Sequence, residues 1–151
     1  YTKKIDKKTL NNFKILCKKQ DRKLYLANNY KLAIKMNLDG VYIPSFNQKL
    51  NINLFRKKKN FIILGSAHNI REIKIKEKQN VQCIFLSPVF RIAKSNNYLG
   101  ISSFKNLMTK TNCKIIALGG INLNNIKKLK MLNCYGFASI SLIKENQKFL
   151  T

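Results

Sequence analysis

The chain has 151 residues, of which 45% are hydrophobic, and its 30 basic and 6 acidic residues give it a formal net charge of +24. This length suits a single domain with a buried core, and the hydrophobic fraction excludes a disordered chain. No apolar run approaches the roughly 20 residues that span a membrane, so we expect no membrane association.

Short apolar runs alternate with helical patterns along the whole chain. Helices are predicted at about 5–20, 69–78, 101–111 and 122–132, and in a short closing segment. A further helix is predicted after the first strand (23–27) and runs through Asn37. The strands are predicted at 23–27, 40–43, 61–65, 82–86, 114–118 and 136–140. Near-continuous apolar strands separated by helices are typical of a parallel sheet that is buried on both faces, which predicts an α/β fold. No linker or shift in composition divides the chain, so we predict one domain over residues 1–151.

Small and polar residues follow almost every predicted strand. In a parallel α/β fold, ligands bind at the carboxyl ends of the strands. Gly119 and Gly120 would let a ligand approach the backbone closely, and a helix that starts near Asn122 would direct free N–H groups outward. Ser141 is predicted to open another helix after the last strand. Two neighbouring helix starts of this kind predict a phosphate site, although a turn capped by Asn would give the same local pattern.

Five segments carry a resemblance to a known family. They are "ANNYKLAIKMNLDGVYIPS" (27–45), "GSAHN" (65–69), "FLSPVF" (85–90), "IIALGGIN" (115–122) and "GFASISLI" (136–143). Their order and spacing resemble the thiamine phosphate synthase/TenI family, over essentially the whole chain from residue 23 onward. The resemblance implies a TIM-type (β/α)8 barrel, of which about six βα units are present here. The first two strands, with a basic Arg-x-Lys pair, would then precede Tyr1, so we interpret the chain as a partial barrel.

The resemblance also implies an activity, namely the condensation of hydroxymethylpyrimidine diphosphate with thiazole phosphate to thiamine phosphate and pyrophosphate. It implies a set of substrate-binding residues: Asn28, Ser66, Lys94 (with Arg91 as the alternative), Gly119, Gly120, Ile140 and Ser141. The family's Mg²⁺ would be held at the positions of Asn29 and Asn47, where the family pattern has Asp. Two amides in place of two carboxylates predict weakened Mg²⁺ binding. No catalytic residue is assigned, and His68 is interpreted as structural.

Related tautomerases place a catalytic His where this chain has Pro88, and this difference favours the synthase. Two alternatives stay open: a family member that binds a thiazole or pyrimidine phosphate, without catalysis or in a tautomerase-like way, and a basic nucleic-acid-binding domain. The lysines spread over every predicted helix, so we expect nucleic acid to bind only non-specifically through net charge. The expected partners are small phosphate and diphosphate substrates, with a homo-oligomer possible.

The four cysteines are far apart in the sequence and include no C-x-x-C pair. With only one His in the chain, this spacing argues against a zinc site. Cys83 and Cys113 fall in or beside apolar strands, where reduced thiols are the rule, so we predict a cytoplasmic protein. For the Gly-Gly pair, we expect Gly120→Val to weaken phosphate binding more than it weakens folding.

Overall fold

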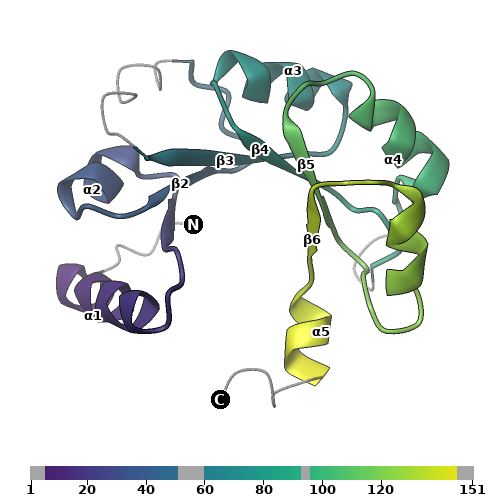
Figure 1. The fold of residues 1–151 in the computed structure, drawn as a ribbon. Coiled ribbons are helices and arrows are strands. Elements are labelled where there is room, and N and C mark those ends of the chain that lie inside the picture. Colours follow the sequence, from purple (N-terminus) through teal and green to yellow (C-terminus); the bar gives the residue numbers. More distant parts are fainter. Residues whose placement is uncertain (1–5, 51–59, 93–95, 146–151) are drawn as a thin grey trace.

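The computed structural model describes residues 6–50, 60–92 and 96–145, and it shows a parallel α/β fold (Figure 1). The strands are β1 (Tyr25–Ala27), β2 (Gly40–Ile43), β3 (Ile62–Ala67), β4 (Cys83–Leu86), β5 (Lys114–Leu118) and β6 (Gly136–Ala138). The helices are α1 (Lys7–Lys19), α2 (Tyr30–Lys35), α3 (Ile70–Lys78), α4 (Gly100–Met108), the 3₁₀ helix η2 (Ile126–Met131) and α5 (Ile140–Glu145). The six strands pair in chain order and every pair is parallel, which confirms the predicted fold class of an incomplete barrel.

The sheet curves into an arc whose convex side is covered by α2, α3 and α4 (Figure 1). Side chains that point to this side from the central strands are fully buried, as Val41, Ile63, Ile84 and Ala117 show with exposed fractions of 0–2%. Phe104 of α4 is equally buried. Most of the hydrophobic stabilisation therefore lies between the strands and the outer helices.

The concave face of the sheet is apolar but only half-buried. Tyr42 and Phe85 meet edge to face on it, with ring centroids 5.9 Å apart. An apolar hollow of about 290 Å³ lies on this face, lined by Tyr25, Tyr42, Leu64, Phe85, Leu118 and Ala138, one residue from each strand. The prediction that both faces are buried is therefore wrong for this face. The reason is that the described strands do not close into a ring: β1 and β6 each pair with one strand only.

Two predicted elements differ from the structure. The helix predicted at 122–132 is the shorter 3₁₀ helix η2, because the Asn122 side chain accepts the N–H groups of Asn124 and Asn125 and holds these residues in a turn. The strand predicted at 136–140 ends at Ala138, because the Ser139 hydroxyl accepts the N–H of Leu142 and starts α5.

Within the described parts of the chain, no helix has both the length and the apolar composition needed to cross a bilayer. The four cysteines are free and half-buried. Among the same described residues, no cluster of three or more His, Cys, Asp or Glu side chains could hold a metal ion.

Candidate functional site

The parallel pairing brings the carboxyl ends of all six strands to one edge of the sheet, which we call the mouth. The predicted site residues that reach the mouth are Asn28, Asn29, Asn47, Ser66, Gly119, Gly120, Ile140 and Ser141. Lys94 lies outside the described residues. Arg91, its alternative, is exposed beyond the end of β4.

Three asparagines lie at the β1 and β2 ends of the mouth, and two of them, Asn28 and Asn47, are hydrogen-bonded to each other. Asn28 follows β1 with a positive φ of 58°, a conformation that Asn adopts more readily than most residues, and its side-chain oxygen accepts a hydrogen bond from the Asn47 side-chain amide. The Asn47 Oδ1 atom accepts the Lys49 N–H at 3.0 Å. Asn29 caps α2, since its Oδ1 accepts the Leu32 N–H at 3.1 Å. A cavity of about 580 Å³ opens beside this cluster, lined by Asn28, Asn29, Tyr30, Lys31, Phe46, Asn47, Gln48 and Lys49.

The residues of this cluster do not fit a magnesium ion. Mg²⁺ prefers carboxylate oxygens in near-octahedral geometry, and the described lining of the cavity contains no carboxylate. The amide oxygens of Asn28, Asn29 and Asn47 already accept hydrogen bonds from N–H groups of the protein. The described residues of this cluster therefore supply no magnesium site.

The double substitution Asn29→Asp and Asn47→Asp tests this conclusion. We expect it to create Mg²⁺ binding at millimolar concentration or tighter, because it supplies two carboxylates about a cavity that has none. Titration with MgCl₂, followed by calorimetry or by the amide NMR signals of residues 28–31, measures the effect against the unsubstituted chain. If both proteins respond alike to Mg²⁺, these two side chains do not face a common ion site.

Two side chains behind the cavity wall, which the sequence did not lead us to expect, hold the loop after β2, and we call them the buried clamp. Lys76 of α3 has no exposed surface, and its ammonium donates hydrogen bonds to the carbonyl oxygens of Pro44 and Asn47 and to Oε1 of Gln79, at 2.8–2.9 Å. The Gln79 amide in turn donates to the carbonyls of Asn47 and Lys49. The connection after β2 is therefore held from behind by Lys76 of α3 and by Gln79, the C-cap residue of that helix.

The sequence did carry a signal for this clamp. Ile73, Lys76 and Gln79 are spaced by three, so all three lie on the helix stripe that faces the sheet. Gly65 of β3 leaves room for the lysine stem, since a Cβ atom there would lie 3.0 Å from Lys76 Cδ. Burial lowers the pKa of Lys76 to about 8, against a smaller opposing effect of the Glu72 carboxylate.

Gly119 and Gly120 are required by the fold. Both have positive φ, at 95° and 69°. A Cβ atom on Gly119 would lie 2.7 Å from Pro88 Cβ, and one on Gly120 would lie 2.6 Å from the Phe90 carbonyl oxygen and closer still to the Arg91 carbonyl. The side chain added by Gly120→Val would meet backbone atoms of the β4 loop, so the structure gives reason to expect a direct loss of folding, against the expectation from the sequence.

The β5 and β6 ends lie side by side, as the phosphate prediction requires, but other atoms hold them there. Ser139, which sequence analysis passed over in favour of Ser141, donates from its hydroxyl to the Ile121 carbonyl at 2.7 Å and caps α5. Ile140 and Ser141 are exposed in the first turn of that helix.

The N–H groups at the start of the turn after β5 are not free, contrary to prediction. The Asn122 N–H donates to the Asn125 side chain, and the N–H groups of Asn124 and Asn125 donate to the Asn122 side chain. The Asn125 amide also donates to the Gly120 carbonyl at 2.7 Å. The turn is therefore closed by its own asparagines.

The β3 and β4 ends complete the mouth. Ser66 lies within β3, one residue beyond the predicted strand end, and is 5% exposed on the same pleat face as Leu64. His68 is tied down on two sides: its N–H donates to Glu72, and its ring Nδ1 lies 2.8 Å from the Ser87 carbonyl oxygen. These contacts fix the turn after β3, which is a structural role for His68.

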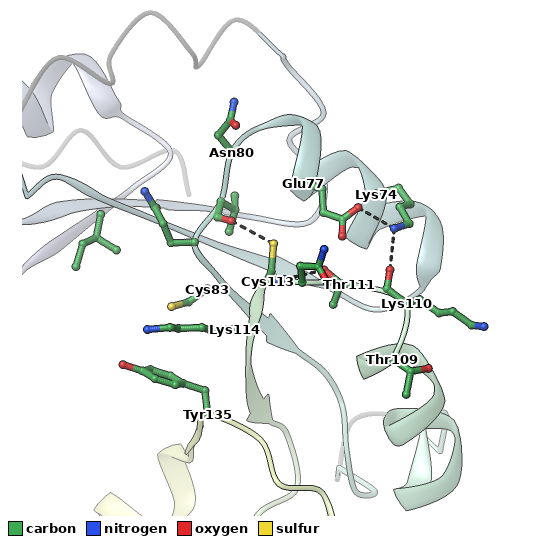
Figure 2. A pocket seen from close by; sticks show the side chains of 14 residues that line it. Lys74, Glu77, Asn80, Cys83, Thr109, Lys110, Thr111, Cys113, Lys114 and Tyr135 are labelled. Carbon is green, nitrogen blue, oxygen red and sulfur yellow. Dashed lines mark hydrogen bonds and ion pairs between the residues drawn. The ribbon is translucent and has the colours of Figure 1, made fainter.

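A larger cavity, of about 910 Å³, lies at the opposite end of the sheet (Figure 2). It adjoins the first residues of β3, β4 and β5, and Lys114 lies over the Tyr135 ring there, 4.4 Å from the ring centroid. Lys74 bridges the Glu77 carboxylate and the Lys110 carbonyl at its rim (Figure 2). Because ligands of parallel α/β barrels bind at the carboxyl ends of the strands, we assign this cavity no catalytic role despite its size.

The chain matches the sequence model of a family described as thiamine monophosphate synthase over residues 3–143. The chain belongs to the thiamine monophosphate synthase family. Relatives include a protein of Aquifex aeolicus named "Putative thiamine-phosphate synthase 2", which is 31% identical over 132 residues that cover 86% of this chain and 70% of that protein. The thiamine-phosphate synthase of Methanococcus vannielii is 27% identical over 82% of this chain and 60% of its own length.

A solved structure shows the same fold. The thiamine phosphate pyrophosphorylase from Pyrococcus furiosus superposes with a TM-score of 0.73 at 19% identity, covering 92% of this chain and 69% of that one. The chain thus spans about 60–70% of the length of these family members, and the open sheet corresponds to part of their fold. The resemblance seen in the sequence motifs is confirmed at the level of the family.

Proposed function

We propose that the protein acts in thiamine biosynthesis as a thiamine phosphate synthase, joining hydroxymethylpyrimidine diphosphate to thiazole phosphate and releasing pyrophosphate. The observation that supports this proposal is that the family match extends over residues 3–143 while the motif residues from all six strands meet at one mouth. The parallel pairing gathers these strand ends at one edge, where we propose that both substrates bind.

For this reaction the mouth would have to bind two phosphorylated substrates and stabilise the departing pyrophosphate. Departure leaves a pyrimidine-methyl cation and develops negative charge on the leaving group, which N–H donors and cations stabilise. The Asn28 cluster with Lys31 and Lys49 is proposed to hold the diphosphate. Ser66, on the inner pleat face, is proposed to contact the pyrimidine.

The thiazole phosphate would then lie at the β5 and β6 ends. Gly119 and Gly120 border this part of the mouth, and Ser141 is exposed on the neighbouring helix. Binding both substrates within the same mouth would bring the thiazole nitrogen to the carbon that loses pyrophosphate. Much of the rate gain would come from this positioning.

Incubating the full chain with both substrates tests the proposal. We expect thiamine phosphate and pyrophosphate to form in equal amounts, measured by thiochrome fluorescence and a pyrophosphate assay. Ser66→Ala should lower kcat/KM about tenfold, the usual effect of one lost hydrogen bond to a substrate. Ser103→Ala, the same change at an exposed position of α4, serves as the control and should leave kcat/KM unchanged. Equal effects of the two substitutions would contradict the assignment of Ser66.

A second candidate function is binding without catalysis. It is favoured by the absence of a carboxylate from the described lining of the cavity where the family's metal site would lie. The two functions differ in a direct way: a binding protein would take up thiazole phosphate or pyrimidine diphosphate, measured by calorimetry, and would form no thiamine phosphate.

A further inference from the structure

We infer that the 580 Å³ cavity at the β1 and β2 ends binds a phosphate or diphosphate group directly, with lysine and amide donors taking the place of a divalent cation. The inference rests on the proposed function only for the class of ligand, which is a phosphorylated small molecule. It concerns the residues 28–31 and 46–49 that line the cavity.

The charges around the cavity favour an anion. Two of its eight lining residues, Lys31 and Lys49, are basic and none is acidic. Asp39, the carboxylate nearest along the chain to residues 46–49, accepts the Leu24 N–H beside the amino end of β2, at the opposite end of the strands from the cavity. A divalent cation would face two ammonium groups with no carboxylate in the described lining to offset them, whereas an anion is attracted by both.

The orientations of the asparagine amides are settled by their hydrogen bonds. Asn29 must turn its oxygen to the backbone N–H of Leu32, because that N–H can only donate. Asn47 must likewise turn its oxygen to the Lys49 N–H, which leaves its nitrogen to donate to the Asn28 oxygen. These orientations leave the NH₂ ends of Asn28 and Asn29 able to donate to a ligand, and an NH₂ group favours an anion over a cation.

The backbone carbonyls of the cavity wall are also engaged from behind. Those of Pro44 and Asn47 accept hydrogen bonds from buried Lys76, and those of Asn47 and Lys49 accept from Gln79. Backbone carbonyls are the usual neutral ligands of a cation in a loop. Three of these carbonyl groups point toward α3. The loop after β2 therefore forms a fixed wall beside the cavity, and the positive charge of buried Lys76 lies behind that wall.

Titration with inorganic pyrophosphate tests the inference. We expect binding to the full chain in the presence of EDTA at constant ionic strength, seen by calorimetry and as shifts of the amide NMR signals of residues 28–31 and 46–49. Adding Mg²⁺ in excess should leave the affinity unchanged or weaken it, because it neutralises part of the charge of the ligand. Binding that requires Mg²⁺, or no binding under either condition, would overturn the inference.

A matched pair of variants separates this site from the general attraction of a highly basic chain. Lys31→Gln with Lys49→Gln should reduce pyrophosphate affinity at least tenfold, since charge-assisted hydrogen bonds contribute most to anion binding. Lys18→Gln with Lys19→Gln removes the same charge from exposed positions at the end of α1 and should change it less than twofold. Equal losses in the two variants would show polyanion attraction only and would overturn the inference. Failure of thiamine phosphate synthesis, in contrast, would leave these binding measurements unaffected.

Discussion

Gly120→Val is expected to lower the free energy of unfolding by about 4 kcal/mol, a large part of the stability of an ordinary domain. Two physical effects combine at this position. A β-branched residue is strained at a φ of 69°, and its Cβ atom would meet the backbone carbonyl oxygens of Phe90 and Arg91. Backbone atoms of a packed loop cannot move aside as the end of a flexible side chain can. Urea unfolding followed by circular dichroism measures the loss.

Gly136→Val is the matched control for this prediction. Gly136 lies in β6, where no atom comes within 4 Å of an added Cβ, and a β-branched residue suits a strand. We expect its unfolding free energy to change by less than about 1 kcal/mol. Similar losses for both variants would mean that the β4 loop does not pack on Gly120 as the structure shows.

Lys76→Met is expected to change how stability depends on pH. The pKa of Lys76 is lowered from 10.5 to about 8 in the folded protein, so the unfolded chain binds more protons between these two values. Stability contributed by this group is therefore reduced below pH 8 and rises as the pH increases toward 10.5. The advantage of the native chain over the variant should grow by about 3 kcal/mol between pH 7 and pH 10.5, since each unit of pKa difference corresponds to about 1.4 kcal/mol.

Urea titrations of the native chain and of Lys76→Met between pH 7 and pH 10.5 measure the free energy of unfolding of each protein. Subtracting one value from the other at each pH removes the effect of the other lysines, which is common to both. Lys78→Met, at an exposed position of the same helix, is the control and should run parallel to the native chain at every pH. A constant gap between the native chain and Lys76→Met would contradict a buried ammonium at this position. The Lys76→Met variant should also bind pyrophosphate more weakly than the native chain, because the carbonyls of Pro44 and Asn47 lose their hydrogen-bond donor.

Much of the fold could be predicted from the sequence because the information is local. Apolar runs such as "IIAL" and "CIFL" mark strands by themselves, and helices between them compel parallel pairing. Parallel pairing then gathers all strand ends at one edge, so Asn28, Asn47 and Gly119 could be assigned to the same mouth without knowledge of any contact. The family motifs added the class of chemistry.

The errors arose where one residue type has several uses. An asparagine at the start of a helix pattern looks like a cap whether the N–H groups beyond it are free or, as at Asn122, are taken up by a closed turn. Ser139 and Ser141 both follow a strand, and the sequence does not show which of them holds the strand end. Only the hydrogen bond to the Ile121 carbonyl distinguishes Ser139 from Ser141. The half-buried inner face followed from the unpaired edges of β1 and β6, which no local pattern reveals.

The amino-acid sequence by itself predicted the parallel α/β fold and the edge at which ligands would bind, and its resemblance to the family implied that Asn29 and Asn47 stand in place of two carboxylates. Only the tertiary structure shows which groups surround these two positions. A lysine in a chain with 30 basic residues is expected to face solvent, yet Lys76 is drawn inward because Gly65 makes room for its stem and the loop after β2 supplies carbonyl oxygens for its charge. That arrangement depends on three segments distant in the sequence, and hydrogen bonds between distant segments exist only once the chain has folded.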